Sequence, residues 1–213
     1  MRRILIILLT SALLLYGCAG GQAGPQGGQP NQSGNIKQCP ASCNDNNPCT
    51  NDYCNASTNF ECRHDAIKNC YSNDEYHFSV TYPEGWTVSG FPLVTVVFVG
   101  PSEDNITSNC NIGEESVGGT TLGEYADIVK NHYTERYGND YSLLSESNIT
   151  VNGLQGYEIT STIKKTDYVQ ESKRAVFIKD QTVHVITCVA STSTFSKSEP
   201  DFDSIISSFK FYD

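Results

Sequence analysis

The sequence predicts an α+β fold, in which helices flank an antiparallel sheet and a small disulfide-rich module precedes them. Short segments with strand-like apolar patterns recur between residues 76 and 190, and several are joined by turns too short for parallel crossovers. Segments with helical periodicity begin near residues 121 and 198. The module is predicted by six cysteines between residues 39 and 70.

The charge balance excludes one class of partner. With 14 Lys and Arg residues against 24 Asp and Glu, the 213-residue chain has a formal net charge of −10. An acidic surface repels phosphate backbones, so we expect no nucleic-acid partner. None of the motifs G-x-S-x-G, H-E-x-x-H, G-x-G-x-x-G or the P-loop occurs. We therefore expect a protein that is not an enzyme and has no cofactor.

The N-terminus has the pattern of an export signal. Two arginines precede an apolar run over residues 4–15, which as a helix reaches about 18 Å and is too short for a hydrocarbon core of roughly 30 Å. The sequence LYGC at residues 15–18 resembles a lipobox, in which a small residue precedes a lipidated cysteine. We predict that residues 1–18 are a lipoprotein signal peptide, and that lipidated Cys18 holds the chain on the extracytoplasmic face of the cell membrane of a bacterium or archaeon. An ordinary secretory peptide is the alternative.

The next segment has the composition of a tether. Residues 19–38 are rich in Gly, Gln and Pro and have Lys37 as their only charge. Such a segment buries too little apolar area to offset the entropy of ordering its backbone. We predict a flexible linker with an end-to-end distance of about 25 Å.

Residues 39–70 contain too few apolar side chains for a hydrophobic core. Behind an export signal the compartment is oxidising, so we expect disulfides to hold this module together. Six cysteines allow 15 pairings, which the spacing leaves open, and the C-x2-C spacing typical of zinc sites is missing. The cysteines expected to form disulfides within the module are Cys39, Cys43, Cys49, Cys54, Cys62 and Cys70.

The first loop of the module carries oxygen-bearing side chains. Asp45, Asn47 and Asp52 offer ligands for Ca²⁺, but the loop lacks the glycine and the terminal glutamate of an EF-hand. Asx side chains before a proline usually form turns, which we expect here, with Ca²⁺ binding as the alternative. The sequence NPCTNDYC at residues 47–54 is similar to short cysteine repeats of the slime-mould extracellular-matrix type. That resemblance implies a structural or adhesive unit.

Residues 71–213 have the length of one domain. Alternation predicts a strand over 76–82, and a continuous apolar run predicts an interior strand over 93–99 that ends at Gly100-Pro101. A helix is predicted from Thr121 to Gly138, because Thr121 and Glu124 have the spacing of a capping box and Gly138 is a typical stop.

Four strands and a second helix complete the domain. The strands are predicted over 142–151, 154–163, 168–178 and 182–190, with an Asn-Gly turn between the first two. The helix is predicted from residues 198–201 onward, with Pro200 in its first turn and its apolar face formed by Phe202, Ile205, Ile206 and Phe209.

Two cysteines remain for this domain. Cys188 falls in a predicted strand and Cys110 in a segment rich in Ser and Asn. With Cys18 lipidated, the eight other cysteines are an even number that can pair completely. We therefore predict a disulfide between Cys110 and Cys188, with free buried thiols as the alternative.

A few charged residues are candidates for binding. The pairs Lys164-Lys165 and Lys173-Arg174 lie on either side of a predicted hairpin, which we expect to be a solvated tip; a basic patch that contacts anionic headgroups or an acidic partner is the alternative if the pairs meet across it. His132 lies on the first helix, where a surface histidine is more common than a catalytic base. The acidic pairs at residues 103–104 and 114–115 are predicted to lie in loops and face water.

The order of these motifs resembles a known family. The segments Tyr76-x-Phe78 and Tyr82-Pro83-x-x-Trp86, a helix, an Asn-Gly hairpin and the closing pattern F-x-x-I-I-x-S-F at residues 202–209 are similar to the PsbP family of extrinsic photosystem proteins and its Mog1-like relatives. The resemblance implies an α/β/α sandwich with a central antiparallel sheet, and a non-catalytic role in binding or stabilising other proteins. The expected partner is a protein of a membrane complex or the cell envelope. A solute or metal-ion binder of an envelope system is the alternative, and a hydrolase with an unfamiliar site is a third.

Overall fold

The computed structural model describes residues 37–103 and 106–212. The predicted signal peptide at 1–18, including Cys18, and the linker up to residue 36 lie outside the described residues. The elements below therefore concern the cysteine-rich module and the domain that follows it.

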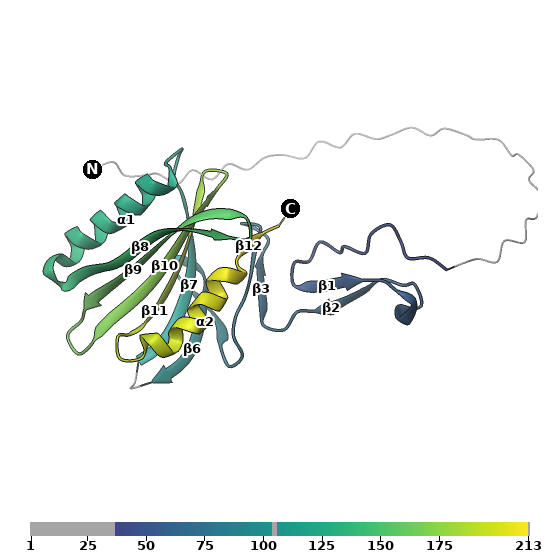
Figure 1. Ribbon diagram of the computed structural model, residues 1–213, viewed down its shortest axis with the longest axis horizontal. Helices are drawn as coiled ribbons and strands as arrows, with labels where there is room; N and C mark the ends of the chain where they lie inside the picture. The colour runs from purple at the N-terminus through teal and green to yellow at the C-terminus, as the bar shows by residue number, and fades with distance from the viewer. Residues whose placement is uncertain (1–36, 104–105, 213) are drawn as a thin grey trace, which may run out of the picture. The chain divides into compact units, whose positions relative to one another are not determined.

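A seven-stranded antiparallel sheet is the centre of the domain (Figure 1). Its strands lie in the order β5-β6-β7-β11-β10-β9-β8. Strands that follow one another in the chain are neighbours in the sheet, except β7 and β8, which are joined by a crossover that contains α1. The strands are β5 (Thr87–Phe91), β6 (Val94–Glu103), β7 (Ile106–Ser116), β8 (Tyr141–Val151), β9 (Leu154–Lys164), β10 (Val169–Lys179) and β11 (Thr182–Ser191).

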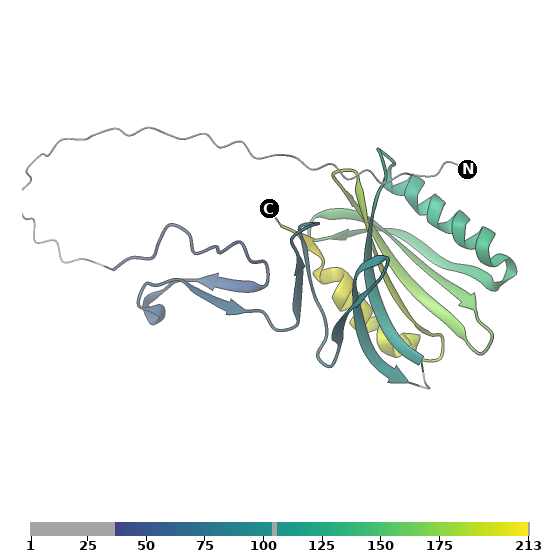
Figure 2. The same ribbon diagram turned by 180° about the vertical axis from the view of Figure 1, so that it is seen from behind.

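The two helices, α1 (Leu122–Tyr137) and α2 (Phe195–Ser208), lie on opposite faces of this sheet (Figure 1; seen from behind in Figure 2). Successive strand residues point to opposite faces, and in β10 the side chain of Val176 clusters with Tyr125 of α1. The next residue, Phe177, belongs to the large core that α2 covers. The predicted α/β/α sandwich is therefore confirmed. Neither helix in the described part of the chain is long and apolar enough to cross a membrane.

A second, three-stranded sheet adds to the core. It consists of β3 (Cys70–Asn73), β4 (Phe78–Thr81) and β12 (Lys210–Phe211), in the order β12-β4-β3. Phe209, just after α2, packs its ring 5.4 Å from Phe78 and 5.2 Å from Phe177. Gly156 of β9 makes room for this stack, because an added Cβ would lie 2.5 Å from the Phe177 ring.

A turn and a strand end predicted from the sequence can be compared with the structure. The Asn152-Gly153 turn is confirmed, since both residues have the positive φ that such a hairpin requires. The strand predicted to end at Gly100-Pro101 instead continues to Glu103, because an irregularity in the pairing between Val99 and Ser102 lets it pass the proline.

The start of the second helix was predicted wrongly. α2 begins at Phe195, so Pro200 lies inside the helix and not in its first turn. Phe195 is buried and packs against Phe202 at a ring distance of 5.6 Å. Burial of the Phe195 ring stabilises the helical turn that precedes Pro200. The helix lacks one backbone hydrogen bond there, because proline has no amide hydrogen to donate.

The N-terminus of α1 is closed by side chains, as predicted. The Thr121 hydroxyl accepts a hydrogen bond from the Glu124 amide, and the Glu124 carboxylate accepts one from the Thr121 amide. We expect Thr121→Ala to lower the free energy of unfolding by about 1 kcal/mol, because one helix amide loses its acceptor. Urea unfolding followed by circular dichroism measures the change; Thr166→Ala, in the exposed turn after β9, is the control and should have no effect.

Disulfides hold the cysteine-rich module together. Its regular structure is a two-stranded sheet of β1 (Thr50–Tyr53) and β2 (Arg63–Ala66) and a 3-10 turn, η1 (Ala56–Thr58). The bridges are Cys39–Cys54, Cys43–Cys62 and Cys49–Cys70, and the last of them joins the module to the first residue of β3. Among the 15 pairings that the spacing left open, the structure contains this one.

A candidate binding cleft between α1 and the sheet

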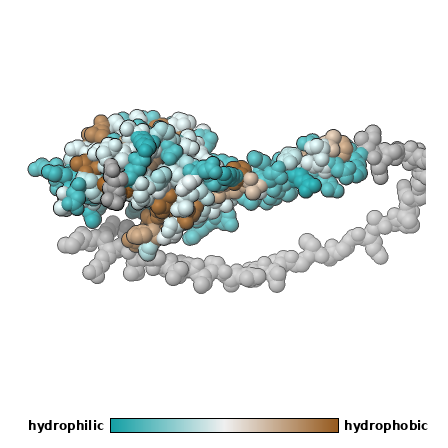
Figure 3. Space-filling model, turned by 90° about the horizontal axis from the view of Figure 1, so that it is seen from below, coloured by the Kyte–Doolittle hydropathy of each residue, from teal (hydrophilic) through white to brown (hydrophobic). Residues whose placement is uncertain are grey.

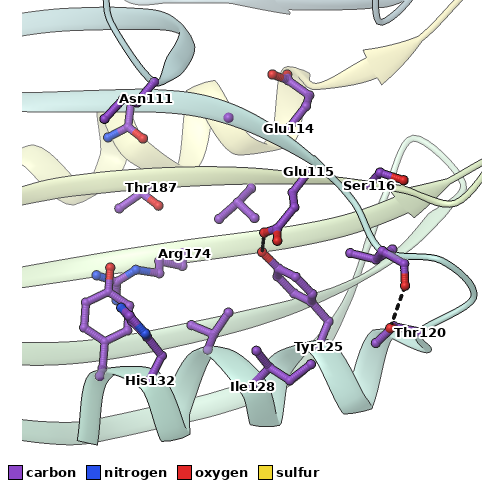
Figure 4. A pocket seen from close by; sticks show the side chains of 16 residues that line it. Asn111, Glu114, Glu115, Ser116, Thr120, Tyr125, Ile128, His132, Arg174 and Thr187 are labelled. Carbon is purple, nitrogen blue, oxygen red and sulfur yellow. Dashed lines mark hydrogen bonds between the residues drawn. The ribbon is translucent and has the colours of Figure 1, made fainter. Parts of the chain in front are cut away.

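A cleft of about 670 Å³ lies between α1 and the sheet surface formed by β7, β10 and β11 (Figure 4). Helix α1 packs over β8, β9 and β10 and leaves the adjoining strands open on this face. Side chains of α1 form one wall, strand side chains form the floor, and Leu93 between β5 and β6 contributes to the opposite side. We call this hollow the α1 cleft.

Three polar side chains lie in one row across the floor of the α1 cleft. Strand pairing places Arg174 of β10 directly opposite Thr187 of β11, and Thr187 directly opposite Asn111 of β7. Paired residues on adjacent strands project from the same face, so the three side chains stand side by side (Figure 4). We call Arg174, Thr187 and Asn111 the cleft row.

Arg174 is buried, with 3% of its surface exposed, although it carries a permanent charge. Its Nη1 donates hydrogen bonds to the Ser161 and Ser172 hydroxyls at 3.0 and 2.8 Å. The Tyr133 ring of α1 lies 4.1 Å from the guanidinium carbon, a cation–π distance. Its Nε is buried without a hydrogen-bond partner. These contacts orient the side chain without neutralising its charge.

The rest of the cleft is mostly apolar. The pairs next to the cleft row are Val176 with Val185 and Val185 with Gly113, so a smooth surface adjoins the polar row. At the rim, Leu93 is 99% exposed and Ile128 of α1 is 55% exposed. On the face that Figure 3 shows, apolar side chains form separate patches on a mostly hydrophilic surface.

The far end of the cleft carries an acidic group. The Tyr125 hydroxyl donates a hydrogen bond to Glu115 Oε2 at 3.1 Å (Figure 4). Burial, and then the adjacent Glu115 carboxylate, raise the pKa of Tyr125 above its ordinary value. The cleft is thus positive at the cleft row and negative at Glu115.

The raised pKa of Tyr125 predicts a pH dependence. Because the folded-state pKa exceeds the unfolded value near 10, the stabilisation is complete below about pH 10 and is lost as the pH rises through the folded-state value. We expect the melting temperature of Tyr125→Phe to fall by roughly 2–4 °C less than that of the wild type between about pH 9 and 11. Thermal circular dichroism measures this. An equal effect of Tyr168→Phe, at an exposed tyrosine, would contradict the assignment.

The charged pairs of this hairpin do not meet in one basic patch. Lys173 and Arg174 are neighbours in β10 and therefore point to opposite faces. Lys173 pairs with Glu199 and Asp203 of α2 at 2.7 and 2.6 Å, while Arg174 lies in the α1 cleft. Lys164 pairs in register with Val169, so it is distant along the hairpin from both.

The acidic pair at 114–115 also lies elsewhere than predicted. Both residues belong to β7 and not to a loop, and they point to opposite faces (Figure 4). The Glu114 side chain is 1% exposed and accepts a hydrogen bond from the Thr95 hydroxyl. Its Oε1 lies 3.7 Å from Nδ1 of buried His184. His132 is exposed at the rim of the α1 cleft, as expected of a surface histidine.

The turns expected in the first loop of the module are present. Asn47 Oδ1 accepts the Cys49 amide at 2.9 Å, and Asp45 Oδ1 accepts the Asn47 amide at 2.9 Å. The structure instead brings His64 to the two aspartates, with Nδ1 2.8 Å from Asp52 and 3.4 Å from Asp45. The hydrogen bond that Asp52 accepts from the Asp45 amide, and then that from His64, lower the pKa of Asp52. These contacts join β2, which carries His64, to β1 and to the first loop of the module.

The structure joins the two cysteines of the larger domain. Cys110, in the segment rich in Ser and Asn, lies in β7 and pairs directly with Cys188 of β11 at a Cα distance of 4.0 Å. Both side chains are fully buried in the core on the α2 side of the sheet. The bridge therefore ties together two central strands directly beneath the α1 cleft.

Family comparison agrees with this architecture. The family model described as PsbP matches residues 68–211. The chain belongs to the PsbP family. A second model, described as a Dictyostelium (slime mold) repeat, matches residues 42–67 within the cysteine-rich module. Among curated proteins, none matches this PsbP-family chain in sequence.

Two solved structures share the fold of this PsbP-family chain. Cyanobacterial PsbP (CyanoP) from Synechocystis sp. PCC 6803 is 17% identical, with a TM-score of 0.53 over 67% of this chain and 91% of that one. The Ran-binding protein Mog1p from Saccharomyces cerevisiae is 12% identical, with a TM-score of 0.50 over 68% of this chain and 95% of that one. The resemblance to PsbP and Mog1 expected from the motifs is confirmed at the level of fold.

The sequence alone does not predict the α1 cleft. Asn111 and Thr187 lie in different strands and become neighbours only through pairing of β7 with β11. The sequence does contain one indication at Arg174. Adjacent residues of a strand point to opposite faces, so Lys173 and Arg174 cannot belong to one patch, and one of the two must lie on each face of the sheet.

Proposed function

We propose that this PsbP-family chain is a lipid-anchored extracytoplasmic protein that binds a protein component of a membrane or envelope complex, without catalysis, through the α1 cleft. Its anchor is Cys18, at the end of the signal-like segment 1–18. Four disulfides among the described residues support an oxidising compartment.

One observation carries the proposal. One part of the floor of the α1 cleft is polar and the adjoining part is apolar, and Leu93 and Ile128 expose 99% and 55% of their surface at the rim. Exposed apolar side chains around a hollow are typical of protein-binding surfaces. A protein of this fold from yeast is described as Ran-binding, which supports protein binding as the use of the scaffold.

Site-specific crosslinking tests the cleft as the docking site. A photo-crosslinking amino acid replaces Ile128 in the native host, and membranes are irradiated before the chain is purified. We expect one discrete crosslinked protein from position 128 and none from position 168, an exposed tyrosine outside the cleft. Equal products from both positions, or none from position 128, contradict the proposal.

Fractionation tests the anchor separately. We expect the native chain to sediment with membranes and to carry a lipid at Cys18, and we expect Cys18→Ser to lack that lipid, because serine has no thiol to carry it. Mass spectrometry of the N-terminal peptide checks the lipid directly. A wild-type chain that is soluble and begins at Met1 contradicts the anchored location.

A further inference from the structure

We propose that the α1 cleft recognises a carboxylate next to an apolar side chain on the partner protein, and that the cleft row binds this carboxylate. The inference rests on the proposed function and names the chemistry of its partner. Arg174 supplies the charge, while Thr187 and Asn111 supply further hydrogen bonds.

Arg174 is a buried charge that the protein does not neutralise. In the described part of the chain, no carboxylate lies within ion-pair distance of its guanidinium, and Nη1 contacts only serine hydroxyls. Lys173, the next residue, has two carboxylates at 2.7 and 2.6 Å. Because burial without a counter-ion is unfavourable, an anion entering the cleft gains a strong charge-assisted interaction there.

The cleft row offers more than one donor. Thr187 and Asn111 are half-buried, and neither side chain has a hydrogen-bond partner among the described residues. Adjacent strands are about 4.8 Å apart, so a row across three strands spans roughly 10 Å. A carboxylate above Thr187 is within reach of donors on both sides. The free hydroxyl and amide supply the specificity that a lone arginine lacks.

Charge and polarity along the cleft fix the orientation of the ligand. Val185 and Gly113 adjoin the row, and Leu93 and Ile128 flank this apolar part. Glu115 lies beyond them at the opposite end. A second negative group of the ligand near Glu115 would be repelled by that carboxylate. An apolar side chain of the ligand would instead pack against Val185. The favoured segment therefore has one carboxylate over the row and apolar atoms over Val185.

A soluble probe tests recognition independently of any partner. The lipid-anchored chain, with its arginines labelled with ¹⁵N, is purified in a non-ionic detergent and titrated with N-acetyl-L-leucine or N-acetyl-L-leucinamide. We expect the carboxylate to shift the Arg174 Nε–Hε signal and to bind at least about tenfold more tightly than the neutral amide. Arg174→Gln identifies the signal and should abolish the preference. Equal affinity for the two probes, or a shift of other arginine signals only, overturns the inference.

Thr187→Val tests the row without touching the charge. Valine has the same shape and suits a strand, so the sheet should remain intact while affinity for N-acetyl-L-leucine falls by about fivefold. Thr160→Val, in β9 and opposite Lys173 on the other face, is the matched control and should bind the probe as the wild type does. No loss of affinity in Thr187→Val overturns the role of the row.

The crosslinking experiment separates the two proposals. If position 128 captures a partner equally in wild type, Arg174→Gln and Thr187→Val, the partner docks in the cleft but the inference on its carboxylate is overturned. If the probe binds as expected and position 128 captures no protein, the proposed protein-binding function fails, and the cleft row binds small carboxylates instead. Capture that needs both Arg174 and Thr187 supports both proposals.

Discussion

Replacing Cys110 and Cys188 together with alanine is expected to lower the free energy of unfolding by at least about 4 kcal/mol. The bridge closes a segment with a sequence separation of 78, and in the chain-entropy model a loop of that length restricts the unfolded chain by about 4.5 kcal/mol. The small cavity left by the two sulfur atoms adds to the loss. Urea unfolding of the full chain, followed by the fluorescence of buried Trp86, measures the change.

The control for this bridge lies in the cysteine-rich module. Alanine at Cys43 and Cys62 removes a bridge with a separation of 19, and neither cysteine belongs to the large sheet. The Trp86 transition should then keep its midpoint. A shift below about 1 kcal/mol for the Cys110 and Cys188 variant would show that sheet pairing alone holds β7 to β11.

Phe209→Ala is expected to lower the free energy of unfolding by about 3–5 kcal/mol, the usual range for a fully buried phenylalanine. The ring is 0% exposed and packs against Phe78 of the small sheet and Phe177 of the large one. Its loss opens a cavity where both sheets and the end of α2 meet. Calorimetry or urea unfolding measures the effect.

Phe211→Ala is the matched comparison. Phe211 contacts the Phe209 ring at 5.2 Å but is only partly buried in the two-residue strand β12. We expect about half the effect of Phe209→Ala, since solvent replaces part of the lost contact. Equal losses for the two variants would contradict the central position assigned to Phe209.

The elements that the sequence predicts well are those with local causes. The β8–β9 hairpin follows from Asn152-Gly153, whose backbone angles suit a two-residue turn. The start of α1 follows from the spacing of Thr121 and Glu124. Each signal lies within a few residues, so it does not depend on the rest of the fold.

The elements that it does not predict depend on distant partners. β7 reads as polar because Asn109 and Asn111 alternate with its core residues, yet it becomes central by pairing with β6 and β11. The early start of α2 depends on Phe195 finding Phe202 in the core. The cleft row likewise requires the register of three strands, which composition does not encode.

The pairing of cysteines in the module has a mechanical consequence. A pull applied at Gln38 passes from Cys39 to Cys54 through one bridge and from Cys49 to Cys70 through another, so only the segment 49–54 can straighten between them. The covalent path then extends to about 30 Å, whereas the unbridged chain from Cys39 to Cys70 would stretch to about 110 Å. Under tension the module therefore extends very little, and the force is transmitted to the domain at Cys70, the first residue of β3.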